Sequence, residues 1–211
     1  DPWKLFDDTR ECIDECHRDG SLKRIVMQDV AKFVEKDPLL ARTLHKLRSS
    51  GKKLFLLTNS YWPYSDCLMS YLLDNELAEY PSWQNYFEQI IVGASKPRFF
   101  NNREPLAEID PVTNEVVARP AKRIQRGKIY QGGSLHDVET SLKVHGEEIL
   151  YVGDHIYGDI LRSKKASLWR SCLVVEELED EITHLGQHRE DFVKLGQLEE
   201  KRRELDSRTN I

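Results

Sequence analysis

Short apolar runs that each stop at small polar residues restrict the fold of this 211-residue chain most strongly. Residues 54–57 lead into Thr58, residues 90–92 lead into Gly93, and residues 149–152 lead into Gly153. Runs this short and continuous are typical of buried parallel strands. Segments with helical apolar spacing separate them, so the sequence predicts an α/β fold with a doubly wound, mostly parallel sheet. Ligands in such folds bind at the carboxyl ends of the strands.

The patterning divides the chain into three parts. Residues 1–50 show helical spacing alone, so we expect them to belong to a cap or to border one. Residues 51–178 hold the strands and form the core. Within them, the polar and proline-containing stretch at about 98–127 is expected to be an inserted arm or hairpin. Residues 179–211 are strongly charged and predict a helical tail that packs one narrow stripe or extends to a partner.

Composition excludes several classes of function. The net charge of −5 and the isoelectric point near 5.9 give no electrostatic case for binding nucleic acid or an anionic membrane. No apolar run approaches the length of a transmembrane helix. The cysteines form no CxxC pair, so we expect them to be reduced and intracellular: Cys12, Cys16, Cys67 and Cys172. The chain begins without a signal-peptide pattern or a methionine, and we expect it to be a piece of a longer protein.

Two carboxylates follow the third apolar run. Asp154 comes directly after Gly153, at the expected carboxyl end of a strand, and Asp159 lies on the turn or first helical turn beyond it. Carboxylate oxygens are the ligands that hard divalent cations such as Mg²⁺ prefer. The alternative is a surface turn in which an aspartate caps the following helix.

Complementary groups follow the other two runs. Thr58 offers a hydroxyl beside backbone N–H groups, and Lys96 offers a flexible cation. Together with a cation held by Asp154 and Asp159, these groups describe a phosphate-binding site. Taken singly, Thr58 also fits a turn or helix cap and Lys96 fits a solvated surface position. Their joint appearance at the ends of successive strands favours the phosphate site.

These motifs resemble a known superfamily. Thr58-Asn59-Ser60, Lys96-Pro97 and Gly153-Asp154-x4-Asp159 resemble motifs II, III and IV of the haloacid-dehalogenase-like phosphohydrolases. The sequences at 57–60, 95–100, 130–134, 151–160 and 163–165 further resemble the cytosolic purine 5'-nucleotidases specific for IMP and GMP. The resemblance implies a Rossmann-like fold, a cytoplasmic homo-oligomer, and Mg²⁺-dependent hydrolysis of purine nucleoside 5'-monophosphates through an aspartyl-phosphate.

The resemblance also implies roles for residues. It makes Thr58, Asn59, Lys96, Asp154 and Asp159 catalytic. Thr58 and Lys96 would bind the transferred phosphoryl group. Asp154 would ligate Mg²⁺, and Asp159 would support it or orient Lys96.

The first helical segment resembles the substrate-recognition stretch of that family. By this likeness Arg10 and Asp14 contact the purine base, while His17, Lys23 and Ser60 line the nucleotide pocket. Arg10, Asp14 and His17 lie at i, i+4 and i+7, on one face of a helix. The alternative for Arg10 and Asp14 is a solvated ion pair within the helix.

One part of the family pattern is missing. Motif I, a strand followed by Asp-x-Asp-x-Thr that supplies the nucleophile, does not occur in these 211 residues. We therefore expect the isolated chain to have little or no activity. Two alternatives stay open: a catalytically inactive binding or scaffold module, and a phosphatase of the same superfamily that acts on another small metabolite.

Overall fold

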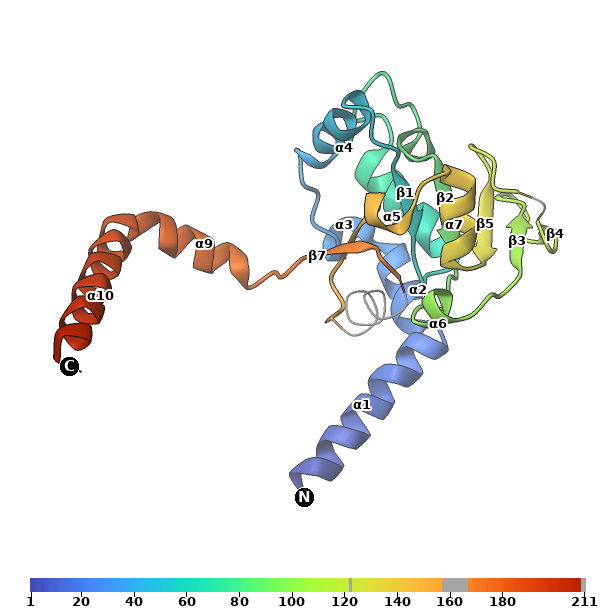
Figure 1. Ribbon diagram of the computed structural model, residues 1–211. Coiled ribbons are helices and arrows are strands. Elements are labelled where there is room, and N and C mark those ends of the chain that lie inside the picture. The colour runs from blue at the N-terminus through green and yellow to red at the C-terminus, as the bar shows by residue number, and fades with distance from the viewer. Residues whose placement is uncertain (122, 157–166, 210–211) are drawn as a thin grey trace.

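Strands in two sheets form the centre of the molecule (Figure 1). The computed structural model describes residues 1–121, 123–156 and 167–209. The larger sheet has the order β1-β2-β5-β3-β4, with bounds β1 (Phe55–Leu57), β2 (Gln89–Val92), β5 (Ile129–Gly132), β3 (Leu106–Ile109) and β4 (Val116–Ala118). β1, β2 and β5 run parallel. The second sheet pairs β6 (Leu150–Gly153) with β7 (Arg170–Leu173), also in parallel. The predicted α/β class with a mostly parallel sheet is confirmed.

Helices lie before, between and after the strands. The N-terminal ones are α1 (Pro2–Arg18), α2 (Ser21–Gln28), α3 (Val30–Phe33) and α4 (Leu40–Ser49). Those between the strands are α5 (Trp62–Leu73), η1 (Trp83–Tyr86), α6 (Arg98–Asn101), α7 (Leu135–Leu142) and η2 (Gly146–Glu148). The chain ends in α9 (Leu178–Gln187) and α10 (Arg189–Thr209). Asp29, whose backbone angles (φ −150°, ψ 74°) are not helical, separates α2 from α3.

Both faces of the larger sheet are buried. Ile90 and Val92 point to one face, where they pack with Trp62 and Leu73 of α5 and with Ala41 of α4. On the other face, Ile91 packs in a second cluster with residues of α7, of β6 and of the segment just before β7: Val138, Leu142, Tyr151 and Trp169. A strand that is apolar on both faces reads as a continuous apolar run, which explains the pattern in the sequence.

The arm at about 98–127 folds as a hairpin that extends the sheet. β3 pairs antiparallel with both β4 and β5. Asp110 shapes the hairpin turn by accepting the N–H groups of Val112, at 2.7 Å, and Thr113, at 3.0 Å. These two hydrogen bonds hold the pKa of Asp110 below its usual value. The turn is tied to α5 by Trp62, whose indole N–H donates to the carbonyl of Pro111 at 2.8 Å.

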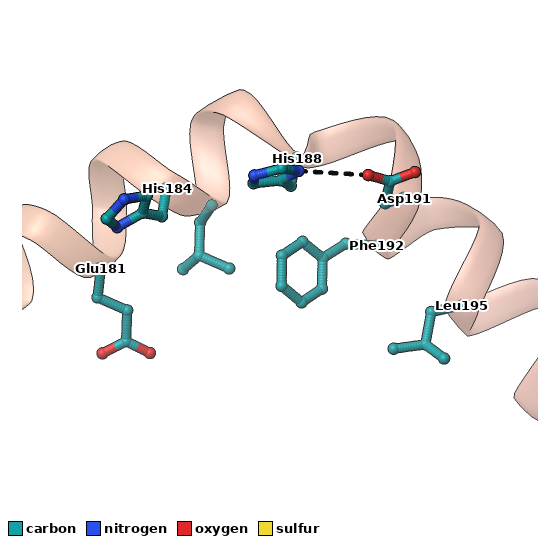
Figure 2. A pocket seen from close by; sticks show the side chains of 7 residues that line it. Glu181, His184, His188, Asp191, Phe192 and Leu195 are labelled. Atoms are coloured by element: carbon teal, nitrogen blue, oxygen red, sulfur yellow. Dashed lines mark hydrogen bonds and ion pairs between the residues drawn. The ribbon is translucent and has the colours of Figure 1, made fainter.

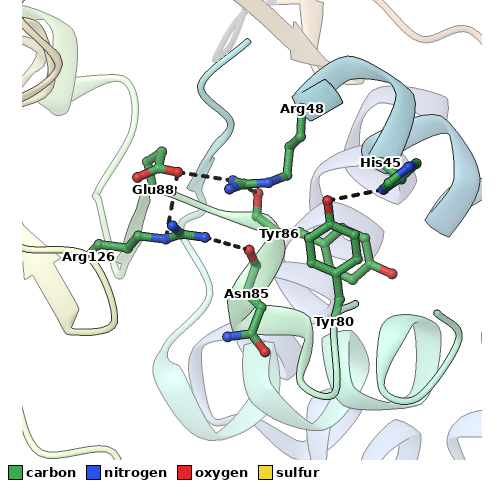
Figure 3. A network of polar contacts seen from close by, with 7 residues as sticks. All are labelled: His45, Arg48, Tyr80, Asn85, Tyr86, Glu88 and Arg126. Carbon is green, nitrogen blue, oxygen red and sulfur yellow. Dashed lines mark hydrogen bonds and ion pairs between the residues drawn. The ribbon is translucent and has the colours of Figure 1, made fainter. Parts of the chain in front are cut away.

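A polar network closes the amino-terminal end of β2 (Figure 3). The Arg48 guanidinium lies 3.1 Å from the Glu88 carboxylate and donates to the Tyr86 carbonyl at 2.7 Å. Arg126 lies 3.6 Å from the same carboxylate and donates to the Asn85 carbonyl. Because Glu88 immediately precedes β2, this network fixes the sheet at the end opposite to the predicted site.

The terminal helices extend from the body (Figure 1). In this view α1 projects downward from the body to the N-terminus, and α9 and α10 project to the left. Their apolar side chains are exposed, including Phe6 on α1 and Phe192 on α10. Among the described residues, no helix combines the length and apolar character needed to cross a membrane.

Candidate functional site

The loops after β1 and β2 meet at the carboxyl end of the larger sheet. The Asn59 side-chain amide donates to the Lys96 carbonyl at 3.0 Å, and its oxygen accepts the Lys96 N–H at 2.5 Å. Two backbone hydrogen bonds also join Thr58 to β2 and the loop after it: the Thr58 N–H donates to the Ile91 carbonyl, and the Ala94 N–H donates to the Thr58 carbonyl, both at 3.0 Å. The Asn59 side chain therefore binds both the carbonyl and the N–H of Lys96, and it fixes the loop after β1 against the loop after β2.

Hydroxyl groups line the first of these loops. The Thr58 hydroxyl accepts the N–H of Ser60 at 3.1 Å, which shapes a tight turn after β1. The Ser60 hydroxyl accepts a hydrogen bond from the Lys23 ammonium at 3.3 Å. That ammonium also lies 5.2 Å from the centre of the Tyr64 ring. The Lys23 ammonium of α2 therefore lies near the end of β1, in the same loop region as the Thr58 and Ser60 hydroxyl groups.

The Lys96 side chain points back toward the strands. Its ammonium donates to the Tyr151 hydroxyl at 2.6 Å and lies 3.5 Å from the carbonyl oxygen of Leu57. Leu57 is the last residue of β1, and Tyr151 lies in β6. Lys96 therefore links the carboxyl end of β1 in the larger sheet to β6 in the second sheet.

The predicted metal residues are described in part. Asp154 follows the last residue of β6 and is exposed. Asp159 lies outside the described residues. Within the described ranges no group of three metal-binding His, Cys, Asp or Glu side chains occurs. Mg²⁺ is commonly bound through one or two carboxylates, with waters and substrate phosphate completing its octahedron, so an exposed strand-end Asp154 fits that ion.

The predicted recognition residues lie in two places. Lys23 and Ser60 contact each other at the site. Arg10 and Asp14 are exposed on α1, where they form a 3.8 Å ion pair with each other. His17 is exposed on the same helix. The structure therefore joins Thr58, Ser60, Lys23 and Lys96, and it places the α1 residues on an exposed helix face.

The arrangement is suited to binding a phosphoryl group. Two ammonium groups and two hydroxyl groups, from three separate segments, lie around the end of β1. Such donors stabilise negative charge best when they are fixed before the ligand arrives.

Tyr151 was not predicted as a site residue, because its place in an apolar run indicated only a strand. Its alternation with Gly153 along β6 was the available signal, because alternate residues of a strand share a face.

The strands beside this site have open edges. Among the described strands, β1 pairs with β2 alone and β6 pairs with β7 alone. The two strands are joined through side chains, since Leu57 and Tyr151 share one buried cluster and Phe55 contacts Trp169. Leu150 and Val152 of β6 are about half exposed, at 59% and 54%. Among the described strands, β1 and β6 therefore each have one edge without a pairing strand beside the site.

A hollow on the C-terminal helices is a separate feature (Figure 2). Its lining includes Leu185, Phe192 and Leu195, together with His188, whose ring nitrogen lies 3.3 Å from the Asp191 carboxylate. All of these residues belong to α9, α10 and the junction between them, and all are exposed. The hollow lacks the strand-end hydroxyl and ammonium groups of the site at β1.

Sequence comparisons relate the chain to known proteins. The whole chain, residues 1–211, matches the 5' nucleotidase family. It is 32% identical over 203 residues to a 5'-nucleotidase domain-containing protein of Dictyostelium discoideum, covering 95% of this chain and 34% of that protein. It is also 32% identical over 183 residues to human 5'-nucleotidase domain-containing protein 2, covering 86% of this chain and 34% of that protein. The chain thus spans about a third of the length of these relatives.

Proposed function

The chain belongs to the 5' nucleotidase family, and from this premise we propose that it is the phosphate-binding part of an enzyme that hydrolyses purine nucleoside 5'-monophosphates. The observation that carries the proposal is the convergence of Lys96, Thr58 and Lys23 at the end of β1. Hydrolysis of a phosphate monoester needs this kind of fixed positive and hydrogen-bonding environment around the transferred group.

In this proposal each residue of the site has one task. Lys96 and the Thr58 hydroxyl bind the oxygens of the phosphoryl group, and Asn59 fixes the loop that carries Lys96. Lys23 and Ser60, which are hydrogen-bonded to each other, would bind the nucleoside part of the substrate. Asp154 and Asp159 would hold Mg²⁺, which supplies a Lewis acid for the charge on the phosphoryl oxygens.

The nucleophile in this proposal comes from outside these 211 residues. Its carboxylate forms a bond to phosphorus as the bond to the 5' oxygen of the nucleoside breaks, and water then hydrolyses the aspartyl-phosphate. The open edges of β1 and β6 support this arrangement, because a strand that carries an aspartate there would place it beside Lys96. The relatives' greater length gives room for such a strand.

Phosphate release from IMP, GMP, AMP and CMP tests the activity in the full-length gene product that contains this chain. We expect turnover of the purine nucleotides with Mg²⁺, loss on chelation and recovery when Mg²⁺ is restored. Asp154→Asn should raise the Mg²⁺ concentration for half-maximal rate about tenfold, because a ligand charge is lost. Binding of nucleotides without phosphate release would instead support the inactive binding module.

Base selectivity tests the role of α1. Arg10→Ala is expected to lower the ratio of kcat/KM for IMP over CMP about tenfold, since one charged hydrogen bond to the purine edge is lost. Arg18→Ala is the matched control, because Arg18 forms a similar exposed ion pair on α1, 3.6 Å from Glu15. An unchanged ratio in Arg10→Ala would favour a phosphatase that acts on another small metabolite.

A further inference from the structure

We propose that Tyr151 is a positioning residue for Lys96: its hydroxyl holds the ammonium group at the end of β1, where the phosphoryl group binds. This inference rests on the proposed function. It assigns a chemical role to a strand residue that lies three positions before Asp154 and that carries no carboxylate.

The contact is a hydrogen bond to the hydroxyl and does not involve the face of the ring. The Lys96 nitrogen lies 2.6 Å from the Tyr151 oxygen and 5.3 Å from the ring centre. The distance to the ring centre is about twice the distance to the oxygen. The nitrogen therefore lies beyond the hydroxyl, near the line that runs from the ring centre through the oxygen, and not above the ring face. Hydrogen bonds with an ionised donor are shorter and stronger than neutral ones, and the 2.6 Å separation is short, as such a bond would be.

The tyrosine itself is fixed by packing. It is 5% exposed and lies in the cluster between the two sheets. Its ring meets Phe100 at 5.7 Å and Trp169 at 5.9 Å between centres, both in edge-to-face geometry. β6 is held in parallel register with β7, where Tyr151 pairs with Ser171. A buried ring with two aromatic neighbours has little rotamer freedom, so its hydroxyl occupies a defined position.

Lys96 is consequently fixed at both ends. Asn59 binds its backbone N–H and carbonyl, and Tyr151 binds its ammonium. A free lysine side chain samples many rotamers and would have to be ordered when substrate binds. Ordering it in advance places the charge correctly for the transition state, which affects kcat more than substrate affinity.

The same contact links the lysine to the carboxylate corner of the site. Tyr151 and Asp154 belong to one strand and its end, so a shift of β6 moves the aspartate and the hydroxyl together. The Tyr151 hydroxyl therefore sets the separation between the cation and the strand end that carries the predicted metal ligand.

Tyr151→Phe tests this role in the full-length protein, because it removes the hydroxyl and keeps the ring. We expect kcat for IMP hydrolysis to fall about tenfold, the effect of losing one hydrogen bond to a charged group, with KM changed less than about twofold. Tyr80→Phe is the matched control, since its hydroxyl lies 3.2 Å from His45 in the network of Figure 3, remote from Lys96. It is expected to leave both constants unchanged.

A second measurement is independent of hydrolysis. Acetylation of Lys96 at limiting reagent, quantified by mass spectrometry against the exposed Lys52, should be faster in Tyr151→Phe than in the parent and unchanged in Tyr80→Phe. Faster acetylation in a protein that proves inactive on nucleotides would uphold the contact and refute the proposed function. Equal acetylation and equal kcat in Tyr151→Phe and the parent would overturn the positioning role, even if the enzyme hydrolyses nucleotides.

Discussion

Lys96→Met in the full-length protein is expected to lower kcat for purine nucleoside monophosphate hydrolysis about a thousandfold, at the upper end of the effect of removing one fixed electrostatic donor. Methionine keeps much of the length and apolar volume of the lysine stem but carries no charge. The phosphoryl group would then lose the cation that the structure fixes against Tyr151 and the end of β1. Steady-state phosphate release measures the effect.

The matched control is Lys128→Met. Lys128 is also paired, with Glu108 at 2.7 Å, but it precedes β5 at the opposite end of the sheet. The Lys128→Met variant should retain kcat within about twofold. An exposed, paired charge at the opposite end of the sheet is screened from the site by solvent and salt. A Lys96→Met protein that is folded and hydrolyses nucleotides as fast as Lys128→Met would exclude Lys96 from the catalytic site.

The parts of the site that the sequence predicted share one physical origin. Thr58 and Lys96 each follow an apolar run, and the carboxyl ends of parallel neighbouring strands meet at the same edge of a sheet. Local patterns therefore predicted which end of each strand lies at the candidate site. The same reasoning predicted the strands at the three apolar runs, which the structure shows as β1, β2 and β6.

The remaining features depend on contacts between distant segments. The antiparallel pairing of β3 with β5 joins residues 20 to 26 positions apart, and no local pattern in the polar arm predicted this pairing. The Lys96–Tyr151 hydrogen bond spans 55 residues. Periodicity identifies the buried face of a strand, but the partner of a polar atom on that face is decided by tertiary packing.

Buried aromatic side chains hold β1 against β6 beside the site. β1 and β6 share no backbone hydrogen bonds in the described part of the chain, so side chains hold them together: Phe55, Phe100, Tyr151 and Trp169. Because Lys96 bridges the same two strands, packing in this cluster and placement of the cation are coupled. Substitutions there are expected to affect activity as well as stability.

Trp83→Ala is expected to have the largest effect on stability, lowering the free energy of unfolding by about 4 kcal/mol. Trp83 is fully buried, packs against Trp62 and Phe87, and donates its indole N–H to Asp66 at 2.9 Å. Its replacement leaves a large cavity and a carboxylate without that donor. Since η1 leads directly into β2, the loss would also loosen the strand that carries the Lys96 loop.

Urea unfolding of the two variants Trp83→Ala and Trp3→Ala measures this effect. Trp3 is 78% exposed on α1, so its loss should change the free energy of unfolding by no more than about 0.5 kcal/mol. Trp83→Phe separates the two contributions, because it retains ring packing and removes the N–H, and it should cost about 2 kcal/mol. Equal midpoints for Trp83→Ala and Trp3→Ala, at equal denaturant slopes, would contradict the central place of Trp83 in the core that supports β2.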